Sequence, residues 1–293
     1  MNPPFERIAI VGVGLIGSSL LRVFRREGVA RTLVAADASA AVRARVVDLG
    51  LADAVHATAG DAADGADLVI LCTPVGTFEA LGAEVGPRLA PGAILSDAGS
   101  VKAAAVRALA PHVPPHAHLV PAHPVAGTEN SGPDSGFATL FEGRWCILTP
   151  EEGTDAAAVA KVAALWRRIG SNVETMDPGH HDKVLAITSH LPHLIAYTIV
   201  GTATDLEETT KSEVIKFSAG GFRDFTRIAA SDPIMWRDIF LANREAVLEM
   251  AQRLTEDLTM LQRAIRWGEG ETLEALFRRT RDIRRGVIDA KQA

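Results

Sequence analysis

Histidines supply the first candidate chemistry in this sequence. His123 stands directly before Pro124, at the end of an apolar stretch that begins at Leu119 and is expected to form a further strand of a largely parallel sheet. A neutral imidazole accepts a proton near pH 7, so His123 is a candidate general base. A histidine between buried core and open crevice can equally be a hydrogen-bonded core residue, and both interpretations stay open at this stage.

A second group of histidines lies further along the chain, in the stretch His190-Leu-Pro-His193. His190 and His193 are three residues apart and fall on one face of a helix, while Pro192 interrupts the backbone hydrogen bonds between them. Such a pair can bind a metal, and His180 and His181 are nearby. No acidic or cysteine partner stands at a suitable spacing, so we expect no metal.

Glycines near the start of the chain predict a dinucleotide site. The apolar run Ile8–Val11 is typical of a strand buried on both faces. Gly12, Gly14 and Gly17 follow in the spacing G-x-G-x-x-G, before a helical pattern. In such a turn the first glycine permits a sharp bend, the second lets the backbone approach a pyrophosphate, and the third packs helix against strand. The phosphates would lie at the helix N-terminus.

Two further positions fit a nucleotide site. Asp37 ends the next apolar run, about 20 residues after the last glycine, where a carboxylate binds the ribose diol and favours NAD over NADP. Thr73-Pro74 ends the following apolar run, where the backbone would face the cofactor's ribose. The residues expected to bind NAD are Gly12, Gly14, Leu15, Ile16, Gly17, Asp37, Thr73, Pro74 and Ser100.

Three polar residues in loops have both a structural and a functional interpretation. Ser100 is a good N-cap for a helix expected at Val101–Ala110, yet at the carboxyl end of a strand it also faces the cofactor. Glu129 lies in a loop rich in glycine, serine and asparagine, where it can be a solvated charge. Arg227 ends a glycine turn that contains two arginines and offers a planar fork for a carboxylate.

The order of the expected elements predicts the fold class. Strand and helix patterns alternate up to Met176, which indicates a Rossmann-type, doubly wound α/β domain with a largely parallel sheet. Beyond Asp177-Pro-Gly only helical periodicity remains. We therefore expect an NAD-binding domain at 1–176, followed by an all-α domain at 177–293 for substrate binding and dimerisation.

One expected helix is unusually long. The apolar stripe from Pro233 to Arg266 predicts a single helix of roughly 34 residues, about 50 Å long. This length exceeds what a small domain needs for its own core. We therefore expect it to pack against a second subunit and form a homodimer. A final helix is expected at 271–290.

Composition excludes several classes of protein. The 293 residues carry a net charge of −6 with dispersed Lys and Arg, so we expect no nucleic-acid partner. The two cysteines give neither a disulfide framework nor metal-ligand spacing. We counted no apolar run of the ~18 residues that a membrane helix needs. The expectation is a cytoplasmic protein without a membrane partner.

Taken together, these stretches resemble the prephenate/arogenate (cyclohexadienyl) dehydrogenases of tyrosine biosynthesis. The resemblance extends from Gly12 to about Asn243. Besides the glycine turn it rests on Asp97-Ala-Gly-Ser-Val-Lys102, His123-Pro-Val-Ala-Gly-x-Glu129, His181-Asp182, Ser189-His-Leu-Pro-His193, Gly220-Gly-Phe-Arg-Asp-x-Thr-Arg227 and Trp236-Arg-Asp238.

The resemblance implies an activity and a set of roles. The activity is NAD-dependent oxidative decarboxylation of prephenate or L-arogenate, which gives 4-hydroxyphenylpyruvate or L-tyrosine. His123 would accept the proton of the ring hydroxyl, and Ser100 would bridge that hydroxyl and the nicotinamide. His193, counted with them as catalytic, would hold the substrate together with Arg227. The residues expected to bind substrate are Arg227, Glu129, His190, Gly220 and Trp236.

Two alternatives differ in class. A β-hydroxyacid dehydrogenase has the same layout but carries a catalytic lysine on the helix after the boundary, where this chain has Lys183. A regulatory protein that senses NAD without catalysis would tolerate loss of the histidines. The joint presence of His123, Ser100, His193 and Arg227 argues against it.

Overall fold

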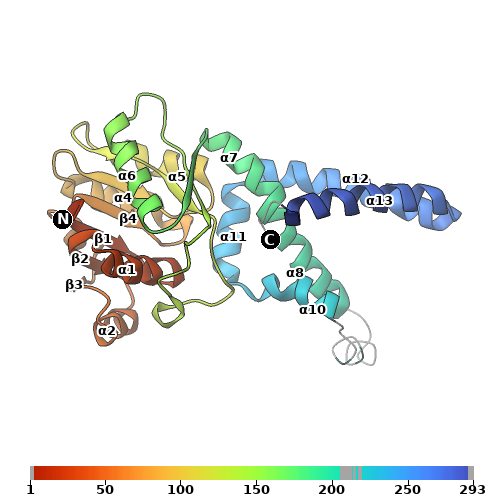
Figure 1. The fold of residues 1–293 in the computed structure, drawn as a ribbon, viewed down its shortest axis with the longest axis horizontal. Helices are drawn as coiled ribbons and strands as arrows, with labels where there is room; N and C mark the ends of the chain where they lie inside the picture. The colour runs from red at the N-terminus through yellow and green to blue at the C-terminus, as the bar shows by residue number, and fades with distance from the viewer. Residues whose placement is uncertain (1–2, 205–212, 214–215, 217–219, 290–293) are drawn as a thin grey trace. The chain divides into compact units, whose positions relative to one another are not determined.

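The computed structural model describes residues 3–204, 213, 216 and 220–289 (Figure 1). By its internal contacts the chain forms two compact units, Met1–Arg244 and Glu245–Ala293. The sequence-based boundary near residue 177 concerns function rather than compactness, and it stays a prediction. The predicted substrate-site residues after that boundary all belong to the first unit.

A six-stranded parallel sheet forms the centre of the first unit. Its strands lie in the order β3-β2-β1-β4-β5-β6, and every pair is parallel. This is the strand order of a doubly wound dinucleotide-binding fold, as the sequence predicted. The strands are β1 (Phe5–Val11), β2 (Ala30–Ala36), β3 (Ala54–His56), β4 (Leu68–Leu71), β5 (Ile94–Asp97) and β6 (His118–Leu119).

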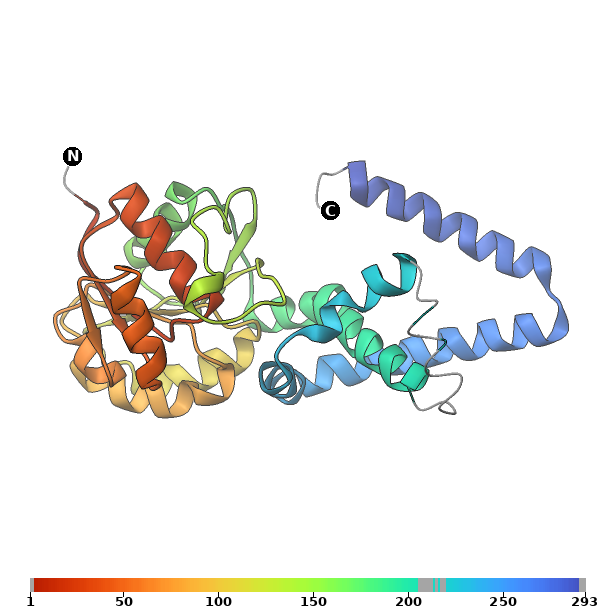
Figure 2. The same cartoon turned by 90° about the horizontal axis from the view of Figure 1, so that it is seen from below.

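Helices cover both faces of this sheet (Figures 1 and 2). Successive strand residues point to opposite faces, so Ile8 and Ile10 join one core while Ala9 and Val11 join the other. The first core is covered by α1 (Leu15–Glu27), α2 (Ala40–Asp48) and α6 (Ala156–Arg168). The second is covered by α3 (Ala59–Ala63), α4 (Phe78–Val85) and α5 (Lys102–Leu109). Short 3₁₀ turns are η1 (Val75–Thr77), η2 (Gly86–Arg88), η3 (Ala110–His112), η4 (Pro133–Ser135) and η6 (Arg227–Ala230).

A second, smaller sheet carries His123. It consists of β7 (Ala122–Pro124), β8 (Trp145–Leu148) and β9 (Asn172–Thr175), with β7 antiparallel and β9 parallel to β8. The sequence placed His123 at the end of a strand of the parallel sheet, which is wrong. Pro121 has no N–H to continue the pairing with β5, so the chain leaves that sheet and begins a new strand.

The helices that follow join α5 through the first of them and through a small core around Trp236. They are α7 (Pro178–Leu185), the π-helical turn η5 (Ala186–His190), α8 (Leu191–Thr204), α10 (Gly220–Thr226) and α11 (Pro233–Ala242). Val101, Trp236 and Ile239 form a small core between α5 and these helices. The π turn ends at His190, two residues before Pro192, with Leu191 N–H donating to the carbonyl of Ala186. The proline ring therefore follows the irregular turn instead of interrupting a regular helix.

The helical run Pro178–Thr204 is long and apolar enough to cross a membrane by length and composition. This run was not expected from the sequence, because a few polar residues interrupt its apolar ones and no unbroken apolar stretch reaches ~18 residues. A core helix of a soluble protein meets the same criterion. This run carries His181 and His190, both fully buried within the first unit.

The second unit is a helical hairpin. Most of α12 (Arg244–Trp267) and all of α13 (Gly270–Asp289) form it, joined at Gly268, whose φ of 69° suits a helix end. The single helix expected from Pro233 to Arg266 is wrong, because the helix breaks at Asn243 (φ −107°, ψ 33°). The Asn243 side chain donates to the carbonyl of Asp182 at 2.8 Å, and this buried contact fixes the break. The final helix lies within one residue of its expected start.

Candidate active site

His123 lies at the centre of the candidate site. Its side chain is only 7% exposed, and its Nδ1 lies 2.8 Å from Nε2 of His181. His181 comes from α7 and is fully buried, with its Nδ1 2.8 Å from Oδ1 of Asp182. The imidazoles of His123 and His181 meet edge to face, with centroids 5.0 Å apart. The site is therefore assembled from a strand of the small sheet and a helix that follows the Rossmann-type domain.

Burial keeps the imidazole of His123 neutral. It lowers the pKa of His123 well below its ordinary value of 6.5, and the neighbouring His181, Lys102 and His190 lower it further. The pKa of His181 is also lowered by burial, although the hydrogen bond to Asp182 acts in the opposite direction. A neutral ring is the form that a general base requires.

A buried ion pair supports the strand under His123. Lys102 is fully buried and donates to Oδ2 of Asp97 and, at 2.7 Å, to the carbonyl of Ala122. Asp97 in turn accepts from the N–H of Ala122 at 3.3 Å. Both backbone groups of the residue before His123 are thus held by charged side chains. The sequence analysis gave Lys102 no role, because a lysine in a helix pattern usually points to solvent.

The structure excludes the capping role that Ser100 could have had. The N-cap of α5 is Val101, which makes no side-chain capping bond. The carboxylate of Asp182 instead accepts from the N–H groups of Lys102 and Ala103, at 2.7 and 2.9 Å. Ser100 is half-buried in the loop between β5 and α5, next to Val101 of the small core that contains Trp236. Its contact with cofactor and substrate stays a prediction.

Trp236 organises the histidines of η5 and α8. His193 stacks on its ring at 3.6 Å between centroids, and His190 meets it edge-on at 6.1 Å. His193 Nδ1 lies 2.9 Å from the carbonyl of Ser189, so it donates there and leaves Nε2 as an acceptor in the neutral ring. His190 is fully buried, with Nδ1 3.1 Å from the Asn243 amide. Nε2 of His190 and Nε1 of Trp236 are buried without a hydrogen-bond partner in the described part of the chain.

Arg227 and Glu129 form an ion pair of 2.6 Å between η6 and the loop after β7. The Arg227 side chain is 58% exposed, so this contact adds little to stability. Gly220 begins α10, and a Cβ built there would meet nothing within 4 Å. Among the described residues, no group of three or more His, Cys, Asp or Glu side chains is arranged to hold a metal ion.

The glycine turn has the shape that a dinucleotide needs. Gly12 has φ +87°, and a Cβ there would lie 2.6 Å from Cγ2 of Thr73. A Cβ on Gly17 would lie 2.1 Å from the carbonyl oxygen of Gly12, so only glycine fits where α1 meets β1. Gly14 has open space on its Cβ side and caps α1 without a side chain, which leaves room at the helix N-terminus.

Asp37 lies beside this turn. Its carboxylate accepts from the N–H groups of Val13 and Ser39, both at 2.9 Å. The second strand thus presents a fixed carboxylate next to the glycine turn, which fits a ribose diol. A Rossmann-type domain with this turn, combined with a buried, neutral histidine, is typical of dinucleotide-dependent dehydrogenases.

Comparison with known proteins gives the family. Residues 20–175 match the nucleotide-binding domain of prephenate dehydrogenase, and residues 177–279 match its dimerization domain. The chain is 42% identical over 280 residues to the cyclohexadienyl dehydrogenase of Zymomonas mobilis, covering 96% of this chain and 95% of that one. It is 31% identical to the prephenate dehydrogenase of Bacillus subtilis, covering 98% of this chain and 77% of that one. The chain belongs to the prephenate dehydrogenase family.

Solved structures agree with this assignment. Prephenate dehydrogenase from Aquifex aeolicus, in complex with hydroxyphenyl propionate and NAD⁺, superimposes with a TM-score of 0.85 at 36% identity, covering 92% of this chain and 94% of that one. Synechocystis arogenate dehydrogenase superimposes with a TM-score of 0.78 at 26% identity, covering 95% and 98%. The predicted family, enzyme class and cofactor NAD are therefore confirmed.

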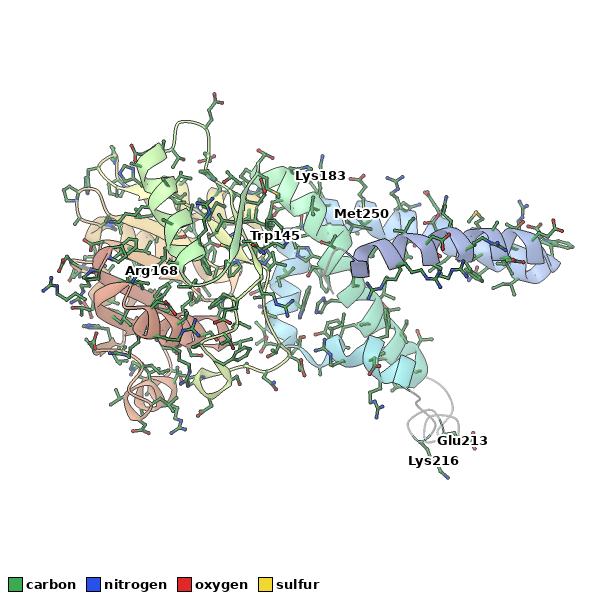
Figure 3. All side chains as sticks on the ribbon, in the orientation of Figure 1. Trp145, Arg168, Lys183, Glu213, Lys216 and Met250 are labelled. Atoms are coloured by element: carbon green, nitrogen blue, oxygen red, sulfur yellow. The ribbon has the colours of Figure 1, made fainter. Side chains whose placement is uncertain are left out.

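The β-hydroxyacid alternative is not favoured. A 3-hydroxyisobutyrate dehydrogenase of Mycobacterium tuberculosis superimposes with a TM-score of 0.52 but only 13% identity, which shows a shared fold alone. Lys183, the lysine that this alternative would use, is exposed on α7 (Figure 3). The neighbouring His181 and Asp182 are the residues of α7 that point into the site.

Proposed function

We propose that this protein oxidatively decarboxylates a cyclohexadienyl dicarboxylate, prephenate or L-arogenate, with His123 as the proton acceptor. The observation that carries the proposal is a buried, neutral histidine whose Nδ1 is already engaged, in a chain that also holds a dinucleotide turn. Its other ring nitrogen remains for a substrate hydroxyl.

The substrate itself supplies much of the driving force. Its ring bears a hydroxyl on one carbon and a carboxylate on the opposite carbon. NAD⁺, when bound, accepts a hydride from the hydroxyl-bearing carbon. His123 takes the hydroxyl proton, CO₂ departs from the opposite carbon, and the ring becomes aromatic. Aromatisation makes the step effectively one-way, so a neutral imidazole suffices as the base.

The cofactor fits the residues present. Gly12, Gly14 and Gly17 would hold the pyrophosphate with the N-terminus of α1, and Asp37 would bind the ribose. Thr73 lies against Gly12 at the end of β4, where a nucleotide's ribose is expected. Leu15, Ile16, Pro74 and Ser100 complete the proposed cofactor set.

The substrate would lie against the residues around Trp236. Nε2 of His193 is positioned to accept a hydrogen bond, and the unpaired buried groups of His190 and Trp236 are further candidates. Arg227 is the proposed carboxylate ligand, which requires that it exchange the carboxylate of Glu129 for that of the substrate. Gly220 stays in the proposed set because it leaves space at the start of α10.

We further propose a homodimer and a cytoplasmic location. The match to a dimerization domain supports the first, and relatives that are biosynthetic enzymes support the second. The proposal includes no nucleic-acid partner, because Lys and Arg are dispersed, and no membrane partner, because the apolar run Pro178–Thr204 carries the buried His181 and His190.

The test is direct. Protein, NAD⁺ and prephenate are mixed, and the absorbance of reduced nicotinamide is followed. The same assay is repeated with L-arogenate. A kcat/KM with either substrate well above that of a His123→Asn control supports the proposal, and the ratio of the two values assigns the preferred substrate. No turnover of either would contradict it.

A further inference from the structure

A continuous series of hydrogen bonds links the start of α5 to His123. Asp182 accepts from two backbone N–H groups of α5 and from His181, and His181 contacts His123. Asp182 is 5% exposed and His181 fully buried, so neither side chain is placed there for solvation. We call Asp182, His181 and His123 the histidine series.

The chemistry of the three groups fixes where each proton lies. A carboxylate can only accept, so the proton on His181 must be on Nδ1, which faces Asp182. Neutral His181 then has a lone pair on Nε2, and His123 must donate to it from Nδ1. A neutral His123 that carries its proton on Nδ1 has its lone pair on Nε2. The series thus selects one tautomer of His123 out of two.

The charges around the series favour this neutral arrangement. Besides His181, Lys102 of α5 and His190 of η5 both disfavour a positive charge on His123. The negative groups are Asp97 of β5, which pairs with Lys102, and Asp182 of α7, which pairs with His181. The carboxylate nearest to His123 along the series is therefore that of Asp182, acting through His181.

We propose that His181, oriented by Asp182, is the positioning residue for His123. It keeps Nε2 of His123 unprotonated, so that the lone pair of this nitrogen accepts the hydroxyl proton, and it stabilises the imidazolium that results. In that step the hydroxyl O–H bond breaks and an N–H bond forms at Nε2. The proton on Nδ1 of His123 stays there and is donated to Nε2 of His181, while the proton on Nδ1 of His181 stays there and is donated to Asp182. This inference rests on the proposed role of His123 as the base.

The comparison with the serine-protease triad gives the scale of the effect. There a buried aspartate holds the catalytic histidine in one tautomer, and its replacement by the amide costs about 10⁴ in kcat. A neutral histidine is a weaker partner than a carboxylate, so the loss here should be smaller. We expect at least about tenfold, since partners that orient a metal-bound histidine are worth about 10–100-fold.

The experiment uses three variants of the full chain. His181→Phe keeps an aromatic ring but has no acceptor for His123. His181→Gln restores an amide oxygen that can accept from Nδ1 of His123. His180→Phe makes the same change one residue earlier, on an exposed side chain, and is the matched control. For each we measure kcat, KM, NAD⁺ affinity and melting temperature.

The expected pattern separates positioning from packing. His181→Phe lowers kcat at least about tenfold with little change in KM or NAD⁺ affinity, His181→Gln recovers part of the loss, and His180→Phe resembles the parent. A His181→Phe variant with kcat within about twofold of the parent would overturn the inference. Equal losses in His181→Phe and His181→Gln would also overturn it, because packing alone would then explain them.

A spectroscopic measurement tests the same point without turnover. Nitrogen-15 spectra of the parent protein, with His123→Asn for assignment, should show His123 protonated at Nδ1 and unprotonated at Nε2. In His181→Phe this preference should be lost. The opposite tautomer in the parent would refute the series, whatever the activity. If neither substrate is turned over while the tautomer is as expected, the proposed function fails, and with it the role of His181 in catalysis, while the selection of the His123 tautomer by His181 stands.

Discussion

At the scale of single residues, burial decides what each histidine can do. His123, His181 and His190 are all withdrawn from water, and the pKa of each is lowered for that reason. His180, directly before His181, is exposed and takes no part in the site. Sequence spacing places these residues near one another, but only the fold separates a buried ring from an exposed one.

Replacement of His123 tests the base. We expect His123→Asn to lose roughly 10²–10⁴ in kcat, because the amide cannot take the proton. The NAD⁺ affinity should be unchanged, since the glycine turn and Asp37 are untouched. The parent's kcat/KM should fall on the acid side, at a pH below the ordinary histidine pKa of 6.5, because the pKa of His123 is lowered. That acid limb should be absent from the variant. A variant with near-parental kcat would show that His123 only packs under its loop.

Protonation of His190 tests burial itself. Burial lowers its pKa from 6.5 to about 4. Between these values the unfolded chain binds a proton that the folded protein does not, so stability falls as pH decreases. This difference in pKa lowers the free energy of unfolding by about 3 kcal/mol in total, from a pH above 6.5 to a pH below about 4. We expect the melting temperature to drop from pH 7 to pH 4.5, and His190→Gln to reduce that slope. His180→Gln is the control, and a slope equal in both variants would contradict the assignment.

At the scale of elements, the glycine turn was predicted well because its constraints are local. The strand, the turn and α1 each have a sequence signal of their own. The steric demand at Gly17 comes from Gly12 and Ile10, which are close in the chain, and that at Gly12 comes from Cys72 and Thr73, directly after β4. The break at Asn243 had no such signal. Neither proline nor glycine stands there, and the cause is a contact with Asp182, 61 residues away.

The role of Asp182 was missed for the same reason. Capping of a helix is usually predicted from the residue just before it, here Ser100. The α5 N-terminus is capped instead by a carboxylate from α7. The antiparallel placement of β7 likewise depends on its pairing with β8, which no pattern within β7 specifies.

Two glycines of the turn make a matched pair of variants. Gly17→Ala would place Cβ 2.1 Å from a backbone oxygen, so we expect a lower melting temperature and loss of NAD⁺ binding together. Gly14 has φ −79° and open space for a Cβ. Gly14→Ala should therefore fold with nearly parental stability and weaken NAD⁺ at least several-fold, because the methyl group occupies the pyrophosphate's space. Calorimetry for folding and titration for binding separate the two. Unchanged NAD⁺ affinity in Gly14→Ala would contradict the proposed site.

At the scale of the whole molecule, the helical hairpin exposes more apolar surface than a monomer needs. Among the residues of α12 and α13 whose burial is described, the large apolar side chains that are exposed are Leu248, Leu258, Met260, Ile265, Trp267, Phe277 and Ile283. Apolar side chains exposed in this number on two consecutive helices are typical of a protein interface. The argument for a dimer therefore rests on this exposed surface and on the family match, no longer on one uninterrupted helix.

The proposed dimer can be tested by placing a negative charge on the exposed apolar surface of α12. Light scattering at micromolar protein should show a dimer for the parent. Ile265→Asp should shift it toward monomer, because a carboxylate in an apolar interface is desolvated without a partner. Gln262→Asp adds the same charge at a neighbouring exposed polar position and should remain dimeric. A parent that is active and monomeric would contradict the proposal.

The shared carboxylate of Asp182 has a consequence for motion. Its two oxygens are committed at once to the amides that start α5 and to the ring of His181. If α7 swung away from α5, the helix end would lose its anion and His123 would lose its fixed orientation in the same movement. Such a movement would remove the orientation that His123 needs to act as the base. For the base to stay active, the contacts of Asp182 with α5 and His181 must therefore persist throughout turnover, and substrate and product must be exchanged without separating α5 from α7.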